Sequence, residues 1–311
     1  MKRILTSLAV LAIVASAASA QVWINEVLTN PNGSDSGTTG NEYFELRGTP
    51  NLSLSGYYLL SIEGGSARGD INQFFDLGSF SIGANGYLFA RQNLSPYTAT
   101  APGATVVENT VGQGWGLTGS STIGYSGDGT QVDLENGSTT IMLINIGSGS
   151  APDVTLDLDA DDNGFLDPLP TGWSIVDSVG IMDGAAAATD VSYGAITLRA
   201  AYPAGTYLGS SPEFGNIIDL PGAPPTSSGA MYVGRKGEST GSTADDWFGA
   251  ILNGAAADPL NITFTYVSDS FYQDLKFADM VFGGVNPIPE PGTLALLGLG
   301  SLAFFLRRKA R

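Results

Sequence analysis

The chain has 311 residues, with 13 Lys and Arg against 30 Asp and Glu, so its formal charge is −17. It contains no His and no Cys, which excludes disulfide bonds, thiol nucleophiles, His-ligated metal centres and a Ser-His-Asp triad. Because contact with phosphate requires clustered Lys and Arg, the acidic balance also argues against nucleic acid as a partner.

Residues 1–20 have the pattern of a secretory signal peptide. Two cations near the start precede an apolar stretch over residues 4–15, and Ala18 and Ala20 form an A-x-A cleavage site. The alternative, an N-terminal membrane anchor, is disfavoured because the apolar stretch is short for a span and ends in small residues. We therefore expect the exported chain to begin at Gln21.

Residues 21–254 contain many short segments that favour β-strands. Runs rich in β-branched and aromatic residues alternate with clusters of Gly, Asn, Ser and Asp, which predicts an all-β sandwich or barrel. The stretches 109–130 and 183–205 are expected to be long surface loops, and residues 255–286 either an edge strand or a stalk. The expected strands lie at residues 21–28, 42–47, 56–60, 86–89, 139–144, 173–179, 230–233 and 261–267.

Several segments of this body resemble the lamin tail domain, a family of immunoglobulin-like β-sandwiches found in many exported bacterial proteins. The segments are 24–27, 30–35, 42–47, 54–57, 233–235 and 244–248. The resemblance brackets most of residues 22–250 and implies an immunoglobulin-like β-sandwich with long loop insertions. It also implies a binding or structural module, and it brings no catalytic residues.

One acidic segment has the spacing of a calcium-binding loop. Counted from Asp159 it reads D-x-D-x-N-G-x-x-D, which places Asp159, Asp161 and Asn163 at the first, third and fifth positions. A Gly at the sixth position permits the sharp turn, the carbonyl of Phe165 at the seventh faces the ion, and Asp167 at the ninth binds directly or through water. The spacing resembles the calcium loops of EF-hands, dockerins and thrombospondin-type repeats.

This loop departs from an EF-hand, because its twelfth position is Pro170 rather than Glu and its flanks favour strands. The missing ligand is expected from Asp157, from a distant acid or from water. We expect one weak Ca²⁺ site with a Kd of roughly 10⁻⁴–10⁻³ M, as in extracellular modules. The alternative is a solvated acidic turn. Calcium is favoured because the five acids crowded into residues 157–167 repel one another without a cation.

Two further residue sets suggest other functions. Glu26, Glu42 and Glu45 offer a carboxylate pair of the kind that glycoside hydrolases use, although they also fall in the lamin-tail-like segments. Aromatic side chains dominate the cores of β-sandwiches, so core or rim positions are favoured over a carbohydrate platform for the four tryptophans. These are Trp23, Trp115, Trp173 and Trp247.

Residues 287–311 have the pattern of a C-terminal sorting signal. Pro289, Glu290 and Pro291 precede an apolar run over 294–306 and an Arg-rich terminus. The combination resembles the PEP-CTERM sorting signal of bacteria with a Gram-negative-type envelope. The resemblance implies a short transmembrane helix, whose basic end stays cytoplasmic by the positive-inside rule. It also implies processing by an exosortase, a membrane cysteine protease that recognises the tripeptide and removes the tail.

Together these observations predict a non-catalytic, exported protein of the cell surface or extracellular matrix, with a structural or adhesion-type role. The expected partners are an exosortase-type protease, matrix polysaccharide or surface proteins, and the membrane through the C-terminal segment before processing. Without both ends the body keeps seven cations and 29 acids, a formal charge of −22, which repels nucleic acid and anionic lipid. The alternatives are a surface polysaccharide hydrolase that uses a carboxylate pair, or a carbohydrate-binding module.

Overall fold

The computed structural model describes six ranges of the chain, within which it forms fourteen strands and three single-turn 3-10 helices. This confirms the expected all-β class. The described ranges are residues 21–32, 41–129, 131–182, 190–200, 216–223 and 231–288.

Seven strands form the first sheet, in the order β14-β13-β12-β1-β2-β5-β6. The first four in that order are β14 (Thr263–Thr265), β13 (Trp247–Asn253), β12 (Tyr232–Arg235) and β1 (Val22–Leu28). The rest are β2 (Tyr43–Gly48), β5 (Tyr87–Arg91) and β6 (Thr105–Glu108). All neighbours in this sheet are antiparallel except β5 and β6.

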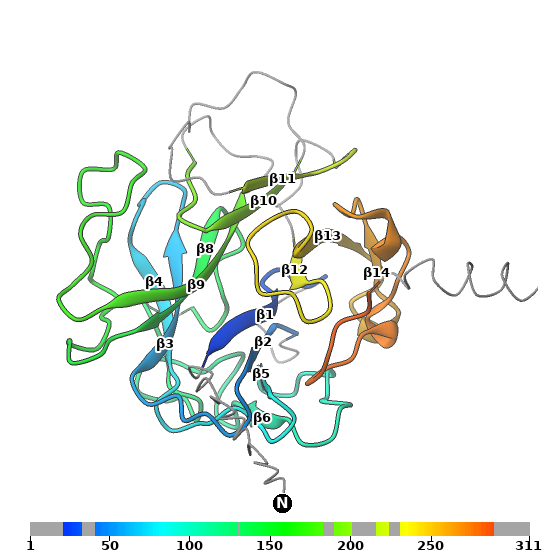
Figure 1. Ribbon diagram of the computed structural model, residues 1–311, viewed down its shortest axis with the longest axis horizontal. Helices are drawn as coiled ribbons and strands as arrows, with labels where there is room; N and C mark the ends of the chain where they lie inside the picture. Colours follow the sequence, from blue (N-terminus) through cyan, green and yellow to red (C-terminus); the bar gives the residue numbers. More distant parts are fainter. Residues whose placement is uncertain are drawn as a thin grey trace, which may run out of the picture.

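The second sheet has the order β11-β10-β9-β8-β3-β4-β7. Its first four strands are β11 (Asn216–Leu220), β10 (Ile196–Ala200), β9 (Ser174–Met182) and β8 (Thr139–Asn145). The others are β3 (Tyr57–Glu63), β4 (Ile71–Asp76) and β7 (Tyr125–Gly127). Strands β9, β10 and β11 run parallel, and the rest pair antiparallel. Figure 1 shows β1 and β2 (blue) beside β3, β4, β8 and β9 (light blue and green).

The main hydrophobic core lies between the two sheets, as in a β-sandwich. Phe44 of the first sheet meets Phe75 of the second with ring centroids 4.8 Å apart, and Trp115 packs 4.8 Å from Phe75. All three are buried, together with aliphatic side chains such as Ile24 and Leu143. Each large apolar side chain buried in this way stabilises the fold by roughly 1.5–3 kcal/mol.

Each sheet is also covered on its outer face. On the first sheet, Tyr43 and Tyr232 join an aromatic cluster with Phe277, which lies in the C-terminal segment 262–282. On the second, Leu60 and its neighbours are covered by side chains from residues 156–173 and 191–193. The central strands are therefore buried on both faces, so their sequences do not alternate regularly between apolar and polar residues.

A β-bulge in β1 decides which way Glu26 points. The register pairs Ile24 with Leu46 and Glu26 with Glu45, so Asn25 is one extra residue in β1. Ile24 faces the core, and strict alternation would place Glu26 there too. The extra residue turns Glu26 to the outer face beside Glu45.

The expectation of surface loops is wrong in two places. The stretch 109–130 contains β7, and Trp115 and Tyr125 in it are buried in the main core. The stretch 183–205 contains β10, although residues 183–189 and 201–205 lie outside the described ranges. Both segments are rich in small and polar residues, so the sequence did not indicate their strands. The apolar partners of these strands come from other parts of the fold.

The segment around β14 helps to cover the outer face of the first sheet. β14 pairs with β13, and the 3-10 helices η1 (Pro259–Asn261), η2 (Ser270–Tyr272) and η3 (Phe277–Asp279) follow or precede it closely. The Tyr272 ring stacks on Phe248 with centroids 3.5 Å apart. This segment thus contributes to the folded body from about residue 262 to residue 282.

Candidate functional site

The acidic loop lies between β8 and β9, against the outer face of the second sheet. Asp159 is fully buried, and its carboxylate accepts hydrogen bonds from the amides of Asn163 (3.0 Å) and Gly164 (2.8 Å). The hydroxyl of Tyr193 donates a third bond to it at 2.6 Å. Asp159 therefore holds the turn together through donors of the protein itself.

The other four predicted calcium ligands lie in the same turn. The carboxylate of Asp167 accepts from the amide of Ala160 at 3.1 Å, and the side chain of Asn163 accepts from the amide of Phe165 at 2.8 Å. Asp161 is exposed. Within the described ranges, no group of three or more acidic side chains is placed so that it could hold a metal ion. Calcium binding at this loop stays a prediction.

More acids gather beside this turn. Asp70 forms a β-bridge with Asp157, and burial followed by the charges of Asp157, Asp162 and Asp128 raises the pKa of Asp70. The only described cation bonded to the turn is Arg68, whose guanidinium donates to the carbonyl of Asp162 at 2.8 Å. The surroundings are therefore strongly anionic and attract cations.

The three glutamates considered for catalysis are all fully buried, and the structure brings only two of them together. Glu26 and Glu45 are register partners on the outer face of the first sheet. Glu42 lies elsewhere and accepts bonds from the indole of Trp115, the amide side chain of Gln92 (2.8 Å) and the amide of Leu134 (2.9 Å). It thereby fastens the segment that carries Trp115 to the first sheet.

Burial raises the pKa of both paired glutamates. The pKa of Glu26 rises to about 7, although the hydroxyl of Tyr232 donates to it and the side chains of Asn286 and Tyr43 face it. The pKa of Glu45 rises well above its ordinary value, first through burial and then through the charge of Glu26. Ionising both of two adjacent buried carboxyls is energetically unfavourable, because the two charges repel each other and neither is hydrated.

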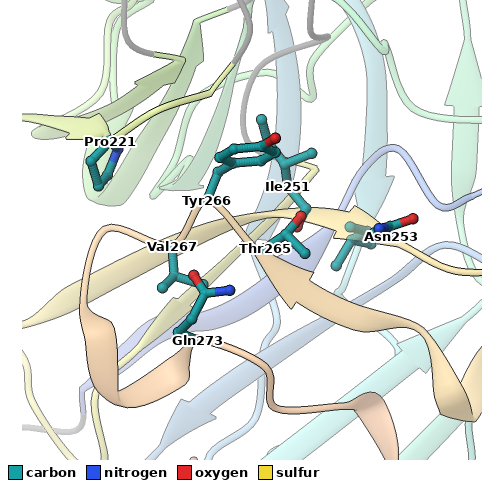
Figure 2. A pocket seen from close by; sticks show the side chains of 8 residues that line it. Pro221, Ile251, Asn253, Thr265, Tyr266, Val267 and Gln273 are labelled. Carbon is teal, nitrogen blue, oxygen red and sulfur yellow. The ribbon is translucent and has the colours of Figure 1, made fainter.

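Two surface cavities are lined without charged residues. The first, of about 450 Å³, lies between β13 and the segment after β14, and Tyr266, Asn253 and Gln273 contribute to it. Figure 2 shows the Tyr266 ring next to Ile251, with Asn253 and Gln273 further out. The second, of about 340 Å³, has a mostly small and apolar lining. None of the three buried glutamates lines either cavity.

The tryptophans lie in the core or its margin rather than in an exposed row. Trp115 and Trp247 are fully buried and Trp173 is nearly so. Trp23 is half-buried, with the guanidinium of Arg47 5.5 Å from its ring centroid. The core interpretation of these residues is therefore confirmed for Trp115 and Trp247.

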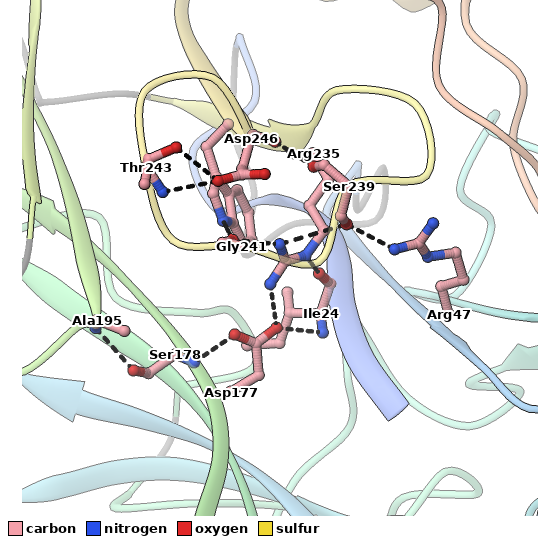
Figure 3. Close-up of polar contacts among 11 residues, drawn as sticks. Ile24, Arg47, Asp177, Ser178, Ala195, Arg235, Ser239, Gly241, Thr243 and Asp246 are labelled. Atoms are coloured by element: carbon pink, nitrogen blue, oxygen red, sulfur yellow. Dashed lines mark hydrogen bonds and ion pairs between the residues drawn. The ribbon is translucent and has the colours of Figure 1, made fainter. Parts of the chain in front are cut away.

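A buried ion pair joins the two sheets, and no motif in the sequence had indicated it. The guanidinium of Arg235 in β12 lies 2.7 Å from the carboxylate of Asp177 in β9, with both side chains almost inaccessible. Asp177 also accepts from the amide of Ile24 at 2.9 Å, and Arg235 donates to the carbonyls of Ile24 and Gly241. Figure 3 shows these bonds converging between the sheets. Because both side chains are almost inaccessible and bond to both sheets, the network ties the sheets together.

The two predicted processing sites lie mostly outside the described residues. This holds for Ala18 and Ala20 of the cleavage site and for Pro289, Glu290 and Pro291 of the sorting signal. Gln21, the expected first residue of the exported chain, is described and exposed. Among the described residues, no helix has the length and apolar character needed to cross a membrane, and the apolar run 294–306 is not among them.

Comparison with protein families shows a match to the PEP-CTERM protein-sorting motif over residues 287–309. This motif indicates an exported, surface-sorted protein, and it is the segment on which exosortase-type processing acts. Comparisons with curated proteins and with solved structures found no match. The sorting motif expected from the sequence is therefore confirmed.

Proposed function

We propose that the protein is a non-catalytic structural or adhesion-type component of the cell surface or extracellular matrix. The main support for this proposal is the sorting motif at 287–309, which directly follows an all-β body. In this proposal an exosortase-type protease removes the tail, and the β body from about Gln21 onward remains outside the cell.

An export experiment tests the sorting step. An epitope-tagged chain is compared with a variant that lacks residues 287–311 and with Glu290→Ala, while Glu238→Ala, at an exposed acid of the body, serves as the control. We expect the parent and the control at the surface without the tail, and both other chains to be missorted. Unchanged surface delivery of both altered chains would contradict the proposal.

The lamin-tail-like, non-catalytic character of the body is part of the same proposal. Two of the resembling segments meet in the structure, since the guanidinium of Arg235 lies 4.3 Å from the ring centroid of Trp247. Glu26, Glu42 and Glu45 are buried away from both cavities, which supports structural roles for them. Incubation of the purified body with matrix polysaccharide tests this, and new reducing ends would favour the hydrolase instead.

The cavity beside β14 supports carbohydrate binding as a second candidate function. Tyr266 is 40% exposed and has a left-handed backbone with φ of 45°, a strained conformation that tends to occur at functional sites. A cavity lined by an exposed aromatic ring and by the amide side chains of Asn253 and Gln273 suits a neutral sugar. Titration with neutral oligosaccharides should show binding that Tyr266→Ala abolishes and Phe271→Ala, at another exposed aromatic, retains.

A further inference from the structure

The last described residues form a strap that is fastened to the body right up to the sorting motif. This C-terminal strap, residues 280–288, buries Met280 and Phe282. Its hydrogen bonds join Thr100 N to Phe282 O (2.8 Å), Asn85 Nδ2 to Gly283 O (2.8 Å), Asn286 Nδ2 to Arg235 O (3.0 Å) and the Tyr272 hydroxyl to Pro287 O (2.6 Å). Pro287 is also the first residue of the matched motif, so no free linker separates the body from the sorting segment.

The buried glutamate pair lies directly beneath this strap. The amide of Gly283 donates to the carboxyl of Glu45, and Asn286 faces Glu26. Asn25, the bulge residue, donates to Glu45 at 2.6 Å. The ion pairs of the described residues include neither glutamate, so the strap covers two acids that no bonded cation neutralises.

Unsatisfied acceptors in this cluster indicate a proton on one of the two carboxyls. Glu26 Oε1, Asn25 Oδ1 and Asn286 Oδ1 are buried and lack a hydrogen-bond partner of good geometry. A buried acceptor without a donor is costly. The Tyr43 hydroxyl is also buried without a partner of good geometry and faces Glu26, so it can donate to one of these three acceptors. A protonated carboxyl is the further donor that the cluster can supply from within. Removing that proton would leave two adjacent charges under the strap.

We propose that residues 280–288 are a proton-controlled latch: a proton on one carboxyl of the buried pair, Glu26 and Glu45, holds the strap on the first sheet, and its loss frees the base of the sorting segment for the membrane protease. The part that concerns the protease rests on the proposed function. The latch itself depends only on the packing of the strap against the buried pair.

The direction of the pH dependence follows from the two states of the strap. With the strap closed, the pKa of Glu26 is about 7, whereas its ordinary value is 4.5. The latch requires that opening the strap hydrates Glu26 and returns its pKa toward the ordinary value. The closed state then holds a proton that the open state releases, and opening becomes about tenfold easier for each pH unit gained between the two values. The other titratable or charged groups around the pair are Tyr43, Arg47, Tyr87, Tyr97, Tyr232 and Tyr272, with Glu238 beyond Arg47.

The tyrosines do not compete in this range, because burial raises the pKa of Tyr43 and Tyr232 well above their ordinary value and that of Tyr87 to about 12. The amide of Gly283 in the strap, the side chain of Asn25 and the charge of Arg47 all lower the pKa of Glu45, but burial and the charge of Glu26 outweigh them. The strap itself, residues 280–288, contains no ionisable side chain. The pH response of the strap is therefore assigned to the glutamate pair.

Hydrogen exchange of the whole protein between pH 5 and pH 7 tests the latch. After correction for intrinsic exchange, protection of the 280–288 amides should fall about tenfold per pH unit, whereas that of β8 should not. Glu26→Gln with Glu45→Gln should remove this dependence, and Glu108→Gln, at a partly exposed ion pair, should keep it. The single variant Glu26→Gln provides the same test if the double variant does not fold.

Several results would overturn the latch. Control by this pair is ruled out if protection of the strap does not depend on pH. It is also ruled out if the glutamine variants show the same pH dependence as the parent. Protection that chelator abolishes and Ca²⁺ restores would assign the pair to a cation instead. A pH-dependent strap combined with equal rates of tail removal in the parent and the glutamine variants would refute access control. Failure of tail removal in every chain would instead count against the proposed function.

Discussion

At the scale of single residues, the buried guanidinium of Arg235 finds its ion-pair and hydrogen-bond partners within the fold. It pairs with Asp177, donates to main-chain carbonyls and lies over the ring of Trp247. Burial raises the pKa of Asp177, and the guanidinium of Arg235 opposes that rise. A buried pair of this kind contributes little net stability, but breaking it leaves a charge without a partner.

Replacing Arg235 alone should therefore be severe. We expect Arg235→Met to lower the free energy of unfolding by about 3–5 kcal/mol, because Asp177 stays buried and unpaired. Urea unfolding measures this loss. Arg199→Met, at the half-exposed pair with Asp219, is the control and should cost less than about 1 kcal/mol. Similar losses in the two variants would contradict a structural role for the buried pair.

The predicted calcium site in the acidic loop can be tested more cleanly at Asp161 than at Asp159. Asp159 holds the turn through three hydrogen bonds, so its removal would disturb the loop with or without a metal. Asp161 is exposed, and Asp161→Asn should leave the apo fold intact. With millimolar Ca²⁺ the melting temperature of the parent should rise by a few degrees. Asp161→Asn should lose most of this rise.

The control for that comparison is Asp245→Asn, at an exposed acid outside the loop. It should retain the calcium response of the parent. Magnesium should stabilise less than calcium, because it requires tighter octahedral geometry and gives up water reluctantly. A parent that melts at the same temperature in Ca²⁺ and in chelator would identify the loop as an acidic turn only.

At the scale of elements, the sequence predicted eight of the fourteen strands in the described ranges. The ranges 42–47 and 139–144 nearly coincide with β2 and β8. It missed β4, β6, β7, β10, β11 and β13. Short runs such as these do not distinguish a strand from other structure by their periodicity alone. The sequence also missed the bulge at Asn25, which depends on the register with β2. The distance between two glutamates in different strands likewise depends on which strands pair and in which register. The spacing of the residues along the chain does not give this information.

The C-terminal cover gives an element-scale prediction. A chain that ends at residue 254 should be poorly soluble, because Tyr232 and Phe248 would lose the aromatic partners contributed by Phe264, Tyr272 and Phe277. A chain that ends at residue 288 should fold normally. Circular dichroism and size-exclusion chromatography compare the two. Equal folding of both chains would show that residues 255–286 act as a stalk.

At the scale of the whole molecule, a strongly anionic β body lies between a predicted signal peptide and the sorting motif at 287–309. Intact mass spectrometry of the protein from the cell surface should find Gln21 as the first residue and no residues after about Pro291. The reasons are the A-x-A site before Gln21 and the sorting motif at 287–309. A mass that includes Met1 would refute N-terminal cleavage, and one that includes Arg311 would refute removal of the tail.

The double covering of the sheets limits how neighbouring molecules can approach. In the described part of the chain, central strands such as β3 and β8 present buried residues on both faces, so copies cannot stack sheet on sheet as in cross-β fibres. In the matrix role proposed above, contacts between copies would then fall on strand edges and on loops such as the one at 157–167. Single substitutions in such a loop are expected to alter association between copies without unfolding the protein.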